Sequence, residues 1–127
     1  MISIDAYSVI IGEEDLVALS RVDERVAYAD LTAEQKTTFD AEIEAAEKHS
    51  VAIITQKFGK EPTDADFLEA ATVAGVVYLM SRKPHNQIAK DQVDQRAEHF
   101  FGMLPNTAGS VTQAEIQVSA TKLGDWI

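Results

Sequence analysis

The feature that most constrains the fold is a stretch from Ala33 to Phe58 that contains neither Pro nor Gly. Thr32 and Gln35 fit a capping box at its start, and Gly59 follows its end. Spacings of three and four predict one buried, mostly apolar stripe on a single helix face: Phe39, Ile43, Ala46, Ser50, Ile53, Ile54 and Phe58. At 1.5 Å per residue this helix spans roughly 39 Å. We therefore expect part of it to extend beyond the core of one subunit.

Shorter helical patterns flank this long helix. Residues 3–20 predict two short helices separated by Gly12, and residues 21–31 predict a loop with room for one helical turn. Thr63 with Asp66 marks the start of a helix that ends before Pro84. It is apolar on most sides, so we expect it at the centre of the bundle. The last helix is expected to run from about Asn86 to Met103. Its buried face comprises Val93, Ala97, Phe100, Phe101 and Leu104, and its solvent face Asp91, Asp94, Gln95 and Glu98.

The predicted fold is all-α, a small antiparallel helical bundle of about four helices over residues 1–104. An extended tail follows over residues 105–127, where Ile116, Val118 and Ala120 alternate with polar residues at the period of a β-strand. Leu123, Trp126 and Ile127 add large apolar side chains to it. We expect this tail to dock on another protein through these six residues. The alternative is that Trp126 and Ile127 fold back onto their own bundle.

Charge and composition narrow the classes of function. The chain carries 21 acidic and 11 basic residues, a net charge of −10, and no Cys. Such a surface disfavours binding to nucleic-acid phosphates, because that affinity comes largely from Lys and Arg. The absence of Cys excludes disulfides and thiolate chemistry. The longest apolar stretch, residues 70–80, is about half the ~20 residues that span a bilayer, and no secretory signal is recognisable at Met1. We therefore expect no membrane association.

Motifs for catalysis or metal binding are missing. None of His49, His85 and His99 belongs to a zinc or di-iron motif. The apolar pattern assigns the paired carboxylates to solvent rather than to a cleft: Glu13, Glu14 and Asp15; Glu42, Glu44 and Glu47; Asp91, Asp94 and Glu98. Neither a phosphate-binding Gly-rich loop nor a nucleophilic Ser turn occurs. The sequence favours a non-enzymatic protein with no catalytic residue, cofactor or metal.

Four segments resemble the head–tail connector (adaptor) proteins of tailed bacteriophages, in the Mu-like connector family. The run Tyr7–Leu19, with Gly12-Glu13-Glu14-Asp15-Leu16 inside it, resembles that family's first short helices and their junction. Phe39–Glu47 resembles its Ala-rich long helix, and Phe67–Arg82 its buried helix, which commonly ends in an aromatic residue and Arg. Val93–Leu104 is similar to the helix that closes the bundle, so the resemblance spans about residues 5–104.

This resemblance implies a structural protein of the virion neck, present in the host cytoplasm during assembly. Identical copies, typically twelve, would form a ring below the portal protein and meet a downstream neck or tail-completion protein. DNA would pass through the lumen without specific binding, because an acidic lining repels the duplex. Two alternatives stay open: an acidic DNA-mimic inhibitor of a nucleic-acid-binding protein, and a small helical assembly chaperone or regulator.

Overall fold

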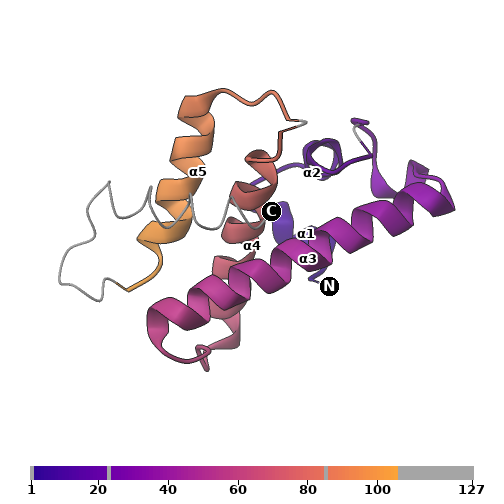
Figure 1. The fold of residues 1–127 in the computed structure, drawn as a ribbon. Coiled ribbons are helices and arrows are strands. Elements are labelled where there is room, and N and C mark those ends of the chain that lie inside the picture. Colours follow the sequence, from indigo (N-terminus) through magenta and orange to yellow (C-terminus); the bar gives the residue numbers. More distant parts are fainter. Residues whose placement is uncertain (1, 23, 85, 106–127) are drawn as a thin grey trace.

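The computed structural model describes residues 2–22, 24–84 and 86–105, and these residues are all-α (Figure 1). They contain no strand. Their elements are α1 (Ile4–Tyr7), α2 (Glu13–Leu19), a 3-10 turn η1 (Tyr28–Asp30), α3 (Ala33–Phe58), α4 (Ala65–Ser81) and α5 (Lys90–Gly102). The predicted small helical bundle is thereby confirmed. The predicted β-forming tail, residues 105–127, lies outside the described residues from 106 onward.

The long helix α3 has the predicted bounds. Gln35 N donates to Thr32 Oγ1 at 3.1 Å, and Thr32 N donates to Gln35 Oε1 at 2.9 Å, which completes the capping box. Gly59 ends the helix with φ of +81°, a left-handed conformation that glycine adopts without strain. Local chemistry therefore determines both ends of α3.

The starts of the next two helices differ from the prediction. Asp64, rather than Thr63, caps α4, because its Oδ1 accepts from the backbone N–H groups of Asp66 and Phe67 at 3.1 and 3.2 Å. Helix α5 begins at Lys90 instead of Asn86. The side chain of Asn86 donates to Leu19 O and Met80 O, so this residue ties two helix ends together and lies before the helix.

Helix α4 forms the centre of the bundle. Every residue from Ala71 to Ser81 is buried. One side of α4 packs with α1, α2 and the first half of α3, and another side packs with the second half of α3 and with α5. In Figure 1, α4 lies between α5 and the N-terminal helices, while α3 crosses below them. The predicted central position of this helix is confirmed.

Gly75 marks the closest approach of three helices. A Cβ atom at this position would meet Ser50 Oγ of α3 and would lie 2.9 Å from two ring atoms of Phe100 in α5. Real Cβ atoms do not tolerate such contacts, because protein interiors are already close-packed. A residue without a side chain is therefore required where α4 passes between α3 and α5.

The stripe on α3 is buried as predicted from Phe39 to Ile54, so the core follows this helix over most of its length. Two expectations for α3 are wrong. Phe58 is 39% exposed and packs edge-on against Phe67. Glu42 and Glu47, which the apolar pattern assigned to solvent, are only 8% and 9% exposed. Partners from other elements cover these two carboxylates, and the periodicity of α3 carries no information about them.

Candidate interaction surfaces

Glu47 anchors the N-terminal segment to α3. Its Oε2 accepts hydrogen bonds from the backbone N–H of Ile2 at 2.8 Å and from the hydroxyl of Tyr7 at 2.7 Å. Burial and the neighbouring Glu47 carboxylate raise the pKa of Tyr7 far above its ordinary value, because both oppose a phenolate. The Tyr7 hydroxyl is consequently a permanent donor, and the segment before α2 is held across the face of α3.

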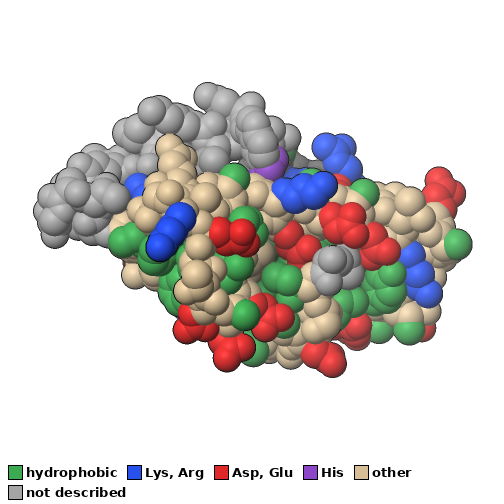
Figure 2. All heavy atoms as spheres, turned by 90° about the horizontal axis from the view of Figure 1, so that it is seen from below, with side chains coloured by type: hydrophobic (Ala, Val, Ile, Leu, Met, Phe, Trp, Pro, Cys, Tyr) green, Lys and Arg blue, Asp and Glu red, His purple; other side chains and the backbone are tan. Residues whose placement is uncertain are grey.

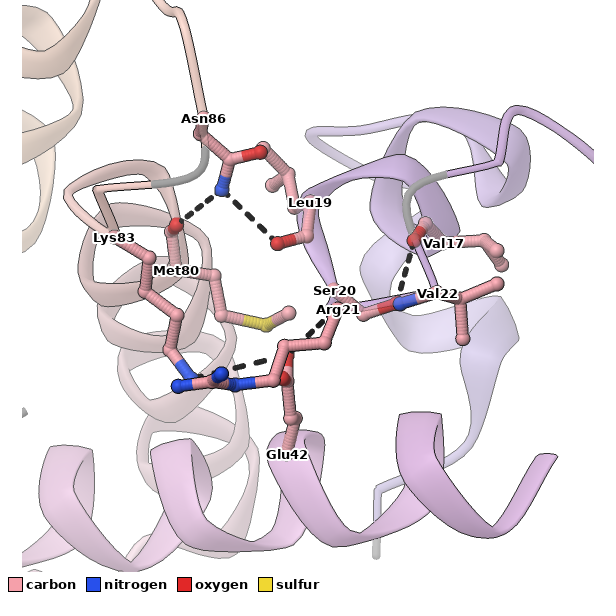
Figure 3. Close-up of polar contacts among 9 residues, drawn as sticks. All are labelled: Val17, Leu19, Ser20, Arg21, Val22, Glu42, Met80, Lys83 and Asn86. Carbon is pink, nitrogen blue, oxygen red and sulfur yellow. Dashed lines mark hydrogen bonds and ion pairs between the residues drawn. The ribbon is translucent and has the colours of Figure 1, made fainter. Parts of the chain in front are cut away.

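Glu42 joins three elements on the other side of α3 (Figure 3). Its Oε2 accepts from the backbone N–H of Arg21 at 3.0 Å, and the Nε atom of Arg21 lies 3.0 Å from Oε1. Lys83 Nζ, beyond the end of α4, lies 3.7 Å from Oε2. Nearby, the Asn86 amide links Leu19 and Met80. The carboxylate is thus a structural tie between the α2 loop, α3 and the end of α4.

An acidic groove of about 690 Å³ runs between α3 and α4. Its apolar floor includes Ile2, Val51 and Leu68. Its charged lining consists of Glu44, Glu47, Glu69 and a single cation, Lys48. Seen from the side on which α3 lies, acidic side chains border apolar ones over much of the surface (Figure 2). This groove suits a partner that brings positive charge and apolar side chains.

A second groove has the opposite character and lies between α5 and the N-terminal helices. It consists of two adjoining hollows of about 550 and 350 Å³ that share Gln92 and Arg96. The smaller hollow has an apolar floor of Ala74 and Val77, with Ile10 and His99 also in its lining. The larger one contains Arg25, whose guanidinium lies 2.6 Å from the carboxylate of Asp15.

Arg96 is the unusual group of this second groove. Its guanidinium donates to Ser81 Oγ, and no carboxylate of the described part of the chain lies within 4.0 Å of it. Burial lowers the pKa of Arg96, and attraction by Asp15 opposes that shift only in part. A guanidinium offers five N–H donors, so this half-buried cation keeps donors for an external acceptor. Sequence reasoning missed this site, because Arg96 occurs in no recognisable motif.

Exposed apolar side chains lie in the turn between α1 and α2, which reaches the Arg96 groove at Ile10. Val9 is 84% exposed and Ile10 is 41% exposed, both in the turn between α1 and α2. Scattered apolar residues on a surface need no explanation, but an exposed Ile in the same hollow as a half-buried Arg has the composition of a protein interface. The turn therefore extends the Arg96 groove as an apolar rim.

The described histidines do not form a metal centre. His49 lies in the interior of α3 and is partly buried, and its burial and the nearby Lys83 lower its pKa. His99 lines the Arg96 groove. Across residues 2–22, 24–84 and 86–105, no group of three or more His, Asp or Glu side chains is placed to hold a metal ion. His85 lies outside these ranges.

The predicted docking residues also lie outside the described part of the chain: Ile116, Val118, Ala120, Leu123, Trp126 and Ile127. The structure therefore neither brings them together nor separates them. Among the helices that it does describe, none is long and apolar enough to cross a membrane. Comparisons with protein-family models, with curated proteins and with solved structures find no match to this chain.

Proposed function

We propose that this protein is a non-enzymatic structural part of a tailed bacteriophage, a head–tail connector whose copies form a ring below the portal and continue the DNA channel toward the tail. The observation that carries the proposal is the order of helices. Two short helices are joined by residues 8–12, a long helix and a buried helix follow, and a fifth helix closes the bundle. The connector resemblance predicts this order over residues 5–104.

The distribution of charge supports the same role. The net charge is −10, and acidic side chains predominate on the face in Figure 2. A channel lined with carboxylates repels the phosphates of a duplex, so DNA can slide through it without binding. In this proposal the tail of residues 106–127 docks on the portal or on a neighbouring subunit, with Ile116, Val118 and Ala120 added as a strand to an exposed sheet edge.

Locating the protein in the particle tests this function. Mass spectrometry of purified virions should find it in a small, fixed copy number, and electron microscopy of necks should show a ring at the portal. Absence from finished particles would instead support an assembly chaperone or regulator. Capture of one basic DNA-binding protein, in a complex that duplex DNA displaces, would support the DNA-mimic alternative.

Deleting residues 106–127 tests the role of the tail. If the tail docks on other subunits, the shortened protein stays helical and folded while assembly of particles fails. If Trp126 and Ile127 instead cover their own bundle, the shortened protein melts at a lower temperature or aggregates. Circular dichroism and a count of assembled particles separate these two results.

A further inference from the structure

Opposite sides of α4 border the two grooves. Ala65, Leu68, Glu69 and Thr72 line the acidic groove, whereas Ala74 and Val77 line the Arg96 groove. At about 100° of rotation per residue, the centres of these two sets lie roughly 160° apart around the helix. The molecule thus presents a carboxylate-rich groove on one side and a groove with a half-buried guanidinium on the other.

We infer that the two grooves are the two halves of one interface, through which copies of this chain associate head to tail. The Arg96 groove of one copy faces the acidic groove of the next, so that Arg96 meets Glu44 and Glu69, and the apolar turn with Val9 and Ile10 contacts apolar side chains of the acidic groove. This inference deepens the proposed function and rests on it, because a ring of identical subunits needs a repeated heterologous contact.

Charge complementarity points to a second copy as the occupant. Arg96 has a hydroxyl as its hydrogen-bond partner and no carboxylate within ion-pair distance among the described residues, so a carboxylate would satisfy its remaining donors. Glu44 and Glu69 are exposed, and the described residues give neither of them an ion pair. Each side therefore has charged groups that the other can pair.

The geometry also determines the symmetry of the contact. An isologous dimer would place the same groove of two copies face to face, and two Arg96 side chains would then repel each other. Two acidic grooves brought together would repel in the same way. Neither isologous contact brings Arg96 to Glu44 and Glu69, whereas contact between unlike grooves does. Such a contact leaves one free groove at each end, so it continues until a ring closes or a filament forms.

Disulfide trapping in the full-length protein tests this arrangement, because the chain has no cysteine of its own. Gln95→Cys places a thiol at the Arg96 groove, and Ala65→Cys places one at the acidic groove; both positions are exposed. When the two variants are mixed and oxidised, we expect a heterodimer with a yield roughly tenfold above that of either variant alone. Gln56→Cys, exposed on α3 and outside both grooves, replaces Ala65→Cys as the matched control.

Charge reversal then tests the pairing itself, in protein that carries both cysteines. Arg96→Glu alone and Glu69→Arg alone should each lower the yield of linked copies at least roughly tenfold, and the two together should restore it. The melting temperature of each variant shows that the fold persists. A yield equal to the Gln56→Cys control, a Gln95→Cys protein that links to itself, or a yield indifferent to both reversals would overturn the interface.

The inference and the proposed function can fail separately. A protein that forms rings in particles without linking these two grooves would remain a connector, with another interface. A protein that links them but never enters a particle would keep the head-to-tail contact and lose the connector role.

Discussion

Two carboxylates on α3, Glu42 and Glu47, are buried and form hydrogen bonds inside the protein. Each accepts a backbone N–H from a segment that is distant in sequence, Arg21 for Glu42 and Ile2 for Glu47. A hydrogen bond to a charged acceptor is stronger than one between neutral groups. These side chains therefore hold the N-terminal segment, residues 2–21, against the long helix. Apolar periodicity could not have predicted this role.

Replacing Glu42 tests this role. Glu42→Gln removes the charge that neutralises Lys83, whose side chain is only 15% exposed, and weakens the contacts to Arg21. We expect the free energy of unfolding to fall by about 1–3 kcal/mol, as for other buried charged hydrogen bonds. Glu44→Gln, on the exposed face of the same helix, is the matched control and should change stability by less than about 0.5 kcal/mol. If urea titrations show the same loss of stability for Glu42→Gln and Glu44→Gln, Glu42 has no special structural role.

Tyr7 gives a prediction about pH. Its pKa is raised in the folded state by burial and by Glu47, so the fold favours the neutral phenol. The contribution is complete below the unfolded pKa of about 10, and it is lost as the pH rises above that value. Near neutral pH, Tyr7→Phe should destabilise the protein by about 1–2 kcal/mol, because Glu47 loses a donor.

Above pH 10 the difference between the wild type and Tyr7→Phe should shrink by about 1.4 kcal/mol per pH unit. The reason is that only the wild type gains stability in its unfolded state from ionisation of this phenol. Tyr78, whose pKa burial also raises, is common to both proteins and cancels from the comparison. Denaturant titrations between pH 8 and roughly 11 measure the change. A difference that stays constant over this range would show that Tyr7 titrates as in the unfolded chain.

At the scale of elements, the sequence predicted what local chemistry decides. The long helix was predicted to the residue, because Thr32, Gln35 and Gly59 determine its ends without help from the rest of the fold. The first turn of α5 was not, because Asn86 is used in tertiary hydrogen bonds to Leu19 and Met80. The candidate site could not be predicted for a related reason. Arg96 is held by a hydrogen bond to Ser81 of another helix and is partly buried between helices, and neither contact is visible in the sequence.

The crossing of α3, α4 and α5 at Gly75 gives an element-scale prediction. Gly75→Ala adds a methyl group where Ser50 and Phe100 already touch the backbone. We expect a loss of about 1–3 kcal/mol from overpacking, despite the gain of up to ~1 kcal/mol that Ala brings to a helix interior.

Ser50→Ala separates the two contacts at this crossing. The buried Ser50 Oγ has no hydrogen-bond partner in the described part of the chain, so its removal should be neutral or stabilising by up to about 1 kcal/mol. In protein that already carries Ser50→Ala, Gly75→Ala should destabilise the fold by less, because only the contact with Phe100 then remains. A double-mutant cycle in urea measures this coupling. Effects that simply add to within about 0.5 kcal/mol would contradict direct contact between the two positions.

At the scale of the whole molecule, a chain of net charge −10 faces a difficulty in assembling with itself, because like charges repel. An interface between copies must therefore bring its few cations to carboxylates of the neighbour. Arg96 meets this need, since it lies in a groove opposite the one that carries Glu44 and Glu69. The proposed ring therefore depends on the distribution of charge, with the cation on one side of each copy and the carboxylates on the other.

The head-to-tail contact makes a prediction about mixtures. A protein with Arg96→Glu has two acidic grooves, and a protein with Glu69→Arg brings a second guanidinium against Arg96 of its neighbour, so neither should associate with itself. An equimolar mixture should associate, because every contact then joins a groove of one variant to the oppositely charged groove of the other. Sedimentation of each protein alone and of the mixture measures this, and rising salt should weaken the mixed assembly by screening exposed ion pairs. Assembly by either variant alone, at the strength of the mixture, would mean that the pairing of Arg96 with Glu69 does not hold the copies together.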